Sequence, residues 1–299
     1  MRFAKGHGTG NDFLILPDPD GAMAVPPNLV ARLCDRRTGL GADGILRVVR
    51  VRAVGDAVPG GAAGPAGAAG AAGAAGAAEW FMDYRNADGS IAEMCGNGIR
   101  VFARYLLDHG LAEGPELAVA TRAGLRLVRA EPGGEYTVDM GAASVDGHAV
   151  AEIGSWRHEG LAVSLGNPHL ACVVDRPVAD FDLTAAPAVD RGEFPDGVNV
   201  EVVRILGERH LEMRVHERGS GETMSCGTGA VAAAVAAATN GQPRLTGVWT
   251  VQVPGGTLTV TLTPATSLLT GPAVIVAEGE LDEAWLAEQT LATTTTTTA

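Results

Sequence analysis

Two cysteines, Cys95 and Cys226, each stand directly before a Gly-x-Gly triplet that opens a run of helix-forming residues. A thiol at such a helix start lies near unpaired backbone N–H groups and near the positive end of the helix dipole, and both favour the thiolate over the thiol. The same N–H groups can hold a carboxylate or another anion. Two such positions in one chain indicate two thiols that serve one anionic substrate.

Two thiols suit the inversion of a carbon that carries a carboxylate and an ammonium. One base removes the hydrogen from one face, and an acid on the other face returns a proton. The intermediate therefore does not have to rotate within the site. The two thiols then share their titration, and neither has a pKa of its own. Charge that grows on the α-carboxylate needs N–H donors at both helix starts. The candidate donors are those of Gly96, Asn97, Gly227 and Thr228.

The composition excludes several classes of protein. A formal net charge of −13 argues against nucleic acid, which requires a basic face, and against an anionic membrane surface. The sequence has no apolar run that could span a membrane and no signal peptide at its N-terminus. Four widely spaced cysteines in 299 residues do not make a disulfide framework. We therefore expect a cytoplasmic protein that acts on a small molecule, and whether it forms a homodimer stays open.

The residues after the two cysteines predict two helices with different surroundings. The first carries one apolar face, formed by Ile99, Phe102, Ala103, Leu106 and Leu107. The second, 228–239, has no polar face and should be buried on all sides. Strand-like segments precede and follow each helix. This order predicts an α+β fold of two pseudo-symmetric domains, each a mainly antiparallel sheet wrapped around a central helix.

The expected domain boundaries follow from this repeat. One half comprises 1–139 together with 272–287 and carries Cys95, and the other comprises 140–271 and carries Cys226. Within the first half, 53–78 consists almost entirely of alanine and glycine, which predicts a flexible insertion. The end of the chain, 291–299, is predicted to be a disordered tail.

Several motifs together resemble the diaminopimelate epimerase family along essentially the whole chain. They are His7 to Phe13, Asn86 to Ser90, Met94 to Arg100, Gly166 to His169, Asn199, Glu217 to Thr223, and Cys226 to Gly229. The resemblance implies an active site in a cleft between the two domains. It also implies interconversion of LL- and meso-2,6-diaminopimelate, on the route to lysine and peptidoglycan, without a cofactor. No cysteine or histidine pair has the spacing of a zinc site.

The resemblance also assigns roles to individual residues. Cys95 is the proton donor and Cys226 the acceptor in the LL-to-meso direction. His169 and Glu217 match positions that tune the thiols, since a carboxylate raises the basicity of a thiolate and an imidazolium lowers it. The matched substrate-binding residues are Asn11, Asn86, Gly96, Asn97, Asn167, Asn199, Glu217, Arg218, Gly227 and Thr228. Without the resemblance, Asn11 is typical of a turn, Arg218 of a surface charge, and His169 equally of a core or a site.

One position departs from the family, and it lies in a second glycine-rich stretch. Gly39 to Gly44 matches the dinucleotide-binding pattern, but a helix precedes it and a strand follows, the reverse of what that pattern requires, so a loop is expected. Within it, Gly44 stands where some family members have a glutamine that meets the substrate. That contact must come from the backbone or water, or be absent.

Three other functions share some of these features. A proline or hydroxyproline racemase would use the same two thiols, but such proteins usually carry histidine where this chain has Asn97. A thiol hydrolase with Cys95 as nucleophile and His169 as base would leave the second Cys-Gly-x-Gly start unexplained. A non-catalytic amino-acid-binding or redox-sensing protein could use the same anion-binding helix starts.

Overall fold

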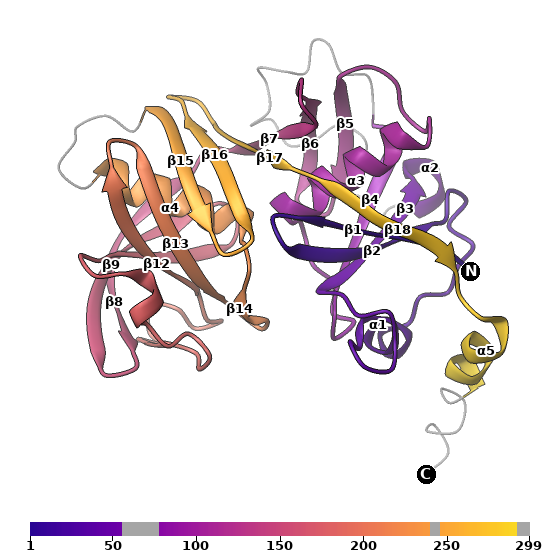
Figure 1. Ribbon diagram of the computed structural model, residues 1–299, viewed down its shortest axis with the longest axis horizontal. Helices are drawn as coiled ribbons and strands as arrows, with labels where there is room; N and C mark the ends of the chain where they lie inside the picture. Colours follow the sequence, from indigo (N-terminus) through magenta and orange to yellow (C-terminus); the bar gives the residue numbers. More distant parts are fainter. Residues whose placement is uncertain (56–77, 240–245, 292–299) are drawn as a thin grey trace. The chain divides into compact units, whose positions relative to one another are not determined.

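The computed structural model describes residues 1–55, 78–239 and 246–291, and its helices and strands form two compact units (Figure 1). The first unit consists of 1–8, 12–131 and the described residues from 273 onward, and the second of 9–11 and 132–272. The expected boundary at 139/140 therefore falls inside the second unit. Most of the predicted 53–78 insertion, and the predicted tail beyond Leu291, lie outside the described residues.

In the first unit a mixed sheet wraps around helix α3 (Gly96–Asp108), which contacts strands along its whole width. The strands, in order across the sheet, are β18 (Val274–Glu280), β1 (Arg2–Gly8), β2 (Asn11–Pro17), β3 (Gly44–Arg50), β4 (Trp80–Asn86), β5 (Glu116–Thr121) and β6 (Gly124–Ala130). The shorter helices are α1 (Pro27–Cys34), α2 (Val51–Val54) and α5 (Glu283–Leu291). The loop expected at Gly39 to Gly44 joins α1 to β3.

In the second unit a sheet wraps around helix α4 (Gly227–Thr239) in the same way. The strands, in order across it, are β11 (Ala188–Val189), β8 (Ser144–Ile153), β9 (Trp156–Ser164), β10 (Pro168–Val173), β12 (Asn199–Gly207), β13 (His210–Glu217), β15 (Gly247–Val253), β16 (Gly256–Leu262), β17 (Ser267–Pro272) and β7 (Glu135–Gly141). The short strand β14 (Gly221–Thr223) pairs with the end of β13, and a 3-10 turn, Val178–Asp180, follows β10.

The two units repeat one pattern of strand pairing. In the first, β2 is parallel to β3 and β3 antiparallel to β4 before α3; after it, β4 is parallel to β5 and β5 antiparallel to β6. In the second unit, β10 is parallel to β12 and β12 antiparallel to β13 before α4. After α4, β13 is parallel to β15 and β15 antiparallel to β16. The predicted fold class, with two pseudo-symmetric halves built around helices, is confirmed.

The composition of α4 decides how it packs. Every residue from Gly227 to Ala238 is buried, as its lack of a polar face predicts. Its side chains are mostly alanine, so β10 and β12 can lie close against it. By contrast, α3 carries a mixed sequence and ends at Asp108, where the chain returns to solvent. Both helices therefore begin at a cysteine inside the sheet that surrounds them.

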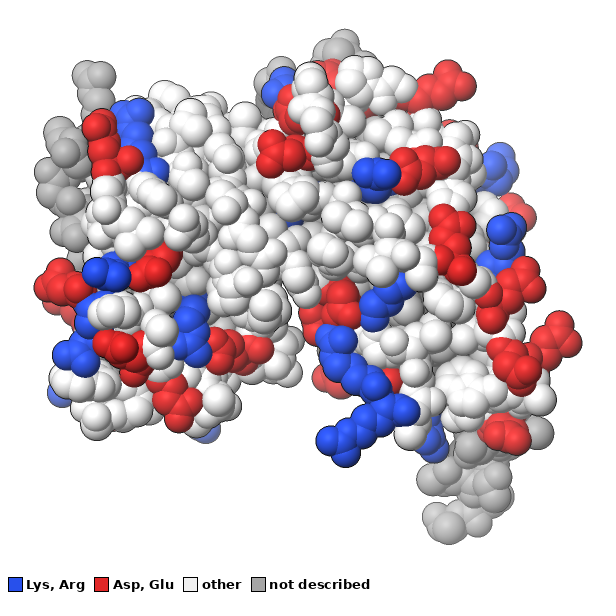
Figure 2. Space-filling view, viewed as in Figure 1, with Lys and Arg blue, Asp and Glu red and all other residues white. Residues whose placement is uncertain are grey.

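The surface carries charges of both signs. On the face that Figure 2 shows, Lys and Arg side chains lie among Asp and Glu side chains, and the whole sequence carries a formal net charge of −13. Among the helices described in the three ranges above, none is both long and apolar enough to cross a membrane.

An ion cluster in the first unit fixes the start of β2 to the loop before β3. Asp12 forms salt bridges with Lys5 at 2.7 Å and with Arg36 at 2.7 Å. Arg36 forms a further salt bridge with Asp43 at 2.8 Å. Burial alone would raise the pKa of Asp12, but hydrogen bonds from Arg36 and Lys5 lower it to about 2. Its carboxylate is thus more stable in the folded chain than in the unfolded one.

We expect Asp12→Asn to reduce the free energy of unfolding at pH 7 by about 2 kcal/mol, the value that corresponds to this pKa difference. Because the folded pKa is the lower one, the contribution is complete above about pH 4 and is lost as the pH falls toward 2. Thermal unfolding of both chains across this range measures it. Asp20→Asn, at an exposed carboxylate 3.7 Å from Arg50, is the control and should change stability little. A constant difference between pH 4 and pH 2 would contradict the assignment.

Candidate functional site

The thiol of Cys95 caps the N-terminus of α3. Its backbone is extended, and its Sγ accepts a hydrogen bond from the backbone N–H of Gly98 at 3.4 Å. A Cβ on Gly98 would lie 3.2 Å from the Leu46 side chain, so glycine lets the helix start lie close to β3. The side chain of Cys95 is half-buried. The helix start that Cys-Gly-x-Gly predicts is therefore present, with the thiol at its first turn.

A fully buried arginine stabilises this first turn. Arg100 donates to the carbonyl of Gly96 at 3.1 Å and to the side-chain oxygen of Asn97 at 3.0 Å. Asn97 is itself fully buried. A Cβ on Gly8 would lie 3.1 Å from the Arg100 guanidinium, so the end of β1 also lies against this turn. The backbone of Gly96 and Asn97, both candidate anion donors, is thus held in place from within the unit.

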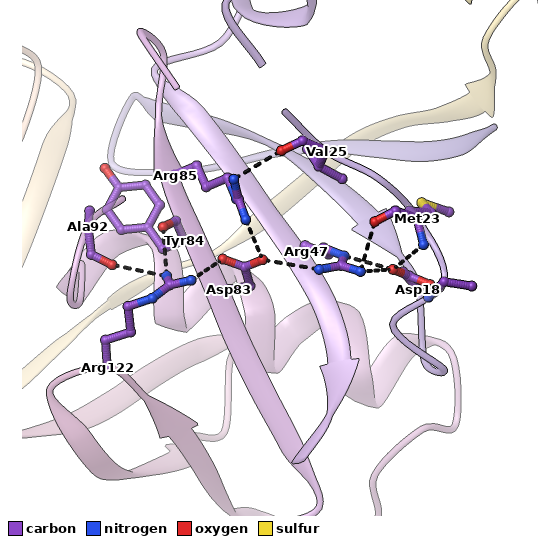
Figure 3. A network of polar contacts seen from close by, with 10 residues as sticks. Asp18, Met23, Val25, Arg47, Asp83, Tyr84, Arg85, Ala92 and Arg122 are labelled. Carbon is purple, nitrogen blue, oxygen red and sulfur yellow. Dashed lines mark hydrogen bonds and ion pairs between the residues drawn. The ribbon is translucent and has the colours of Figure 1, made fainter. Parts of the chain in front are cut away.

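The segment that leads into Cys95 is held by a buried carboxylate with three arginines (Figure 3). Asp83 accepts from Arg122 at 2.5 Å, from Arg85 at 3.3 Å and from Arg47 at 3.4 Å. Arg122 also donates to the carbonyls of Tyr84 at 3.1 Å and Ala92 at 3.4 Å. One guanidinium therefore joins β4 to the last residues before the Cys95 cap.

Asn86 lies on the turn that this arrangement closes. Its side-chain amide donates to Ser90 Oγ at 2.9 Å, and its backbone N–H donates to the Ser90 carbonyl. Arg85 forms an isolated antiparallel bridge with Ile91, which brings the chain back beside β4. The sequence did not single out Asp83 or Arg122, because only strand pairing brings Arg122, in the turn between β5 and β6, to β4.

We expect Arg122→Lys to loosen this segment, because an ammonium cannot bridge a carboxylate and two carbonyls as the planar guanidinium does. The loss of charge-assisted hydrogen bonds should cost about 1.5–3 kcal/mol of stability. Cys95 should then react faster with iodoacetamide, and mass spectrometry of its peptide measures the alkylation rate. Arg129→Lys, at an exposed arginine paired with Glu131, is the matched control. An unchanged alkylation rate in Arg122→Lys would rule out a role in holding Cys95.

The thiol of Cys226 occupies the equivalent place before α4 but is buried. Its Sγ accepts from the backbone N–H of Gly229 at 3.4 Å and lies 3.4 Å from the hydroxyl of Thr228. Burial raises its pKa well above the usual thiol value, and the charges of Glu217 and Glu201 raise it further. The expectation that the helix start favours a thiolate is therefore wrong for Cys226, because desolvation and two carboxylates outweigh the hydrogen bonds from Gly229 and Thr228.

Both predicted tuning residues lie near Cys226 in this unit. Glu217, at the end of β13, accepts hydrogen bonds from Thr223 and from the Cys226 thiol, while burial raises its pKa. His169, on β10, is fully buried, and its Nδ1 lies 2.6 Å from Glu201 Oε1. Burial raises the pKa of Glu201, against the attraction of His169. Glu201 belongs to no motif in the sequence; its one signal is that of an acidic residue inside the apolar segment Asn199 to Val203.

The polar residues of the second unit hold one another in a chain of hydrogen bonds. Asn199 donates to the Pro168 carbonyl at 3.0 Å and accepts from the backbone N–H of Arg218 at 2.9 Å. Asn167 donates to Thr228 Oγ1 at 3.3 Å. The guanidinium of Arg218 is exposed and reaches the carbonyl of Asp196 at 3.2 Å. These side chains are thus positioned by β10, β12 and β13, around the start of α4.

Asn11 belongs to this second unit, although the strands on either side of its turn belong to the first. The turn adopts left-handed backbone at Thr9 (φ 50°) and Gly10 (φ 80°). Thr9 Oγ1 donates to Ser225 Oγ at 2.9 Å, directly before Cys226. The turn that the sequence predicted at this place therefore also brings Asn11 to the unit of Cys226.

The structure accordingly divides the predicted site residues between the two units. The first unit holds Asn86, Cys95, Gly96 and Asn97, and the second holds Asn11, Asn167, His169, Asn199, Glu217, Arg218, Cys226, Gly227 and Thr228. Gly44, where relatives of the resembled family can have glutamine, pairs with Asn86 across β3 and β4. A Cβ there would lie 2.5 Å from the Arg85 carbonyl, so a side chain at this position would require the backbone of this chain to shift. In the described ranges, no three His, Cys, Asp or Glu side chains are grouped to hold a metal ion.

Comparison with known proteins gives consistent results along the chain. The family model described as diaminopimelate epimerase matches residues 3–145 and 161–276. The diaminopimelate epimerase of Thermobifida fusca is 56% identical over 281 residues, which cover 94% of this chain and 98% of that protein. The diaminopimelate epimerase of Streptomyces coelicolor is 53% identical over 295 residues, which cover 96% and 97%.

Solved structures with low identity share the fold. A probable proline racemase from Agrobacterium radiobacter aligns with a TM-score of 0.64 at 16% identity, over 94% of this chain and 93% of that one. A PhzF-family phenazine biosynthesis protein from Bacillus anthracis aligns with a TM-score of 0.61 at 16% identity, over 94% and 99%. These likenesses concern the arrangement of the chain and not the reaction.

Proposed function

The chain belongs to the diaminopimelate epimerase family, and from this premise we propose that it interconverts LL- and meso-2,6-diaminopimelate by proton transfer at two thiols, Cys95 and Cys226. It is an isomerase of lysine biosynthesis. The observation that carries the two-thiol assignment is the repeat: each unit places a cysteine at the start of its central helix, with Sγ 3.4 Å from a backbone N–H of that helix. A single-cysteine mechanism leaves one of these two positions without a purpose.

In the LL-to-meso direction, the Cys226 thiolate accepts the α-proton while the Cys95 thiol donates a proton to the opposite face. One C–H bond and one S–H bond break, and one of each forms, so no electrons are exchanged with a cofactor. The environment of Cys226 supports the role of base, since burial and Glu217 make its thiolate strongly basic. The cost is a small thiolate population near neutral pH, and His169 offsets part of the negative charge around Glu217.

The remaining predicted residues are assigned to the substrate. The backbone N–H groups of Gly96, Asn97, Gly227 and Thr228 are the donors for the α-carboxylate, where charge grows in the transition state. Asparagine amides both donate and accept, so they suit the ammonium and carboxylate groups, and Arg218 suits a second carboxylate. The substrate-binding side chains are then Asn11, Asn86, Asn167, Asn199, Glu217 and Arg218.

The test is incubation of the purified chain with LL-diaminopimelate in deuterated water, without added cofactor. We expect deuterium at the α-carbon and formation of the meso isomer. Exchange with proline or hydroxyproline instead would keep the chemistry and change the substrate. Binding of diaminopimelate without exchange would indicate a non-catalytic binding protein. Amide or ester hydrolysis that is blocked by Cys95→Ser but not by Cys226→Ser would indicate a thiol hydrolase.

A cytoplasmic location completes the proposal. None of the four cysteines, all of which lie in the described residues, forms a disulfide, which fits a reducing compartment. Labelling of the thiols with and without prior reduction of a fresh cell extract tests it, and equal labelling is expected. A homodimer stays a prediction, to be checked by light scattering of the purified chain.

A further inference from the structure

Strand register places a histidine and a glutamate against each other in the second unit. β10 and β12 are parallel, with His169 in register with Asn199 and Glu201 two residues further along. Both side chains have no exposed surface, and His169 Nδ1 lies 2.6 Å from Glu201 Oε1. Two groups at this distance are joined by a hydrogen bond. Burial at this depth tolerates such a pair only as a hydrogen-bonded unit.

The carboxylate also lies against the first turn of α4. A Cβ on Gly229 would be 2.7 Å from Glu201 Oε1, so only glycine lets the helix start this close to the pair. The backbone N–H of the same Gly229 donates to Cys226 Sγ. The pair and the thiol are therefore on neighbouring sides of one helical turn. The other titratable groups that face them are Cys172 on β10 and Glu217 on β13.

The contact with Glu201 decides which ring atom of His169 remains available. Nδ1 is engaged, while Nε2 is buried and has no hydrogen-bond partner among the described residues. A carboxylate that accepts from one imidazole nitrogen fixes the tautomer and the ring orientation. Nε2 is then the one nitrogen that can take part in a further proton contact.

We propose that Glu201 is a positioning residue: its carboxylate holds the Nδ1–H of His169, so that Nε2 is the ring nitrogen left for a proton contact, and it adds its own negative charge beside the Cys226 thiol. This rests on the proposed role of Cys226 as a base. Glu201 does not touch the substrate; it acts through His169 and through its charge.

The first test needs no substitution of Glu201. In wild-type chain with ¹⁵N-labelled histidine, nuclear magnetic resonance reports which ring nitrogen carries the proton. We expect a slowly exchanging Nδ1–H signal at neutral pH, assigned by its disappearance in His169→Asn. An Nδ1 without a proton would overturn the proposal.

The second test follows the charge. Alkylation of Cys226 by iodoacetamide, resolved by peptide mass spectrometry, gives a midpoint pH in each variant. In Glu201→Gln we expect the midpoint to fall by about one pH unit, the usual effect of removing a close negative charge. Glu201→Asp should move it back toward wild type. Glu212→Gln, on β13 and 3.2 Å from Arg204, removes a carboxylate elsewhere in the unit and should leave it unchanged.

A purely structural role for Glu201 would lower the melting temperature without moving this midpoint, and that result would overturn the proposal. If Glu201→Gln does not fold, the midpoint of Glu201→Asp and the wild-type proton signal decide instead. Neither readout uses epimerisation. Failure of the proposed function would show as absent α-carbon exchange with both readouts intact, whereas failure of this inference would show as normal exchange with an unchanged midpoint.

Discussion

Replacing either Cys95 or Cys226 by serine is expected to lower kcat/KM for diaminopimelate epimerisation by about 10²–10⁴-fold, the range typical for the loss of a general acid or base. A hydroxyl keeps its proton far more firmly than a thiol, so serine can neither serve as the base nor exchange roles after turnover. Both directions of the reaction should suffer in both variants, because each thiol is the base in one direction and the acid in the other. Rates of meso formation and of LL formation in deuterated water measure this.

The other two cysteines supply matched controls. Cys34 lies in the core of the first unit and Cys172 in that of the second, and burial raises the pKa of each thiol to about 12. Serine at either position should cost stability, because it buries a hydroxyl, and should leave kcat/KM nearly unchanged. If only Cys95→Ser were inactive, the two-thiol mechanism would be wrong and a nucleophilic cysteine would replace it. Equal loss in all four variants would instead indicate unfolding.

Sequence reasoning succeeded where the signal was local. Cys-Gly-x-Gly predicts a helix that begins at the cysteine, and both α3 and α4 begin there. The run from Gly227 to Ala238 has no polar face, which predicts burial on every side, and the sheet of the second unit surrounds it. Local patterns of this kind depend on backbone hydrogen bonding and on side-chain polarity within a few residues. They can therefore be recognised in the sequence without knowledge of the fold.

The misses all depend on residues brought together from distant segments. Glu201 meets His169 because β10 and β12 are parallel in one particular register, and no pattern in either strand specifies that register. Arg122 reaches Asp83 for a similar reason, because the end of β5 lies beside β4 through strand pairing. The expected thiolate at Cys226 was wrong because its pKa is set by desolvation and by carboxylates on other strands, which the helix-start argument could not include.

The turn that holds Asn11 gives the second large expected effect. Gly255 lies between β15 and β16, and its backbone N–H donates to the Met224 carbonyl at 2.9 Å. A Cβ on Gly255 would lie only 1.7 Å from the carbonyl oxygen of Thr9. The obstacle is backbone on both sides, so no side-chain rotation can make room. Gly255→Ala must therefore separate the Asn11 turn from the segment before Cys226.

We expect Gly255→Ala to cost about 3 kcal/mol of stability, at the upper end of the usual range for overpacking, and to lower the melting temperature by several degrees. Because Asn11 is assigned to the substrate, KM for diaminopimelate should rise in whatever fraction of the chain remains folded. Gly207→Ala is the matched control: Gly207 also lies in the second unit, also has an ordinary φ, and a Cβ there meets nothing within 4 Å. Since both substitutions change backbone freedom alike, any difference between them isolates the close approach at Thr9. Equal melting temperatures would mean that the turn and the β15–β16 loop do not need this close contact to stay together.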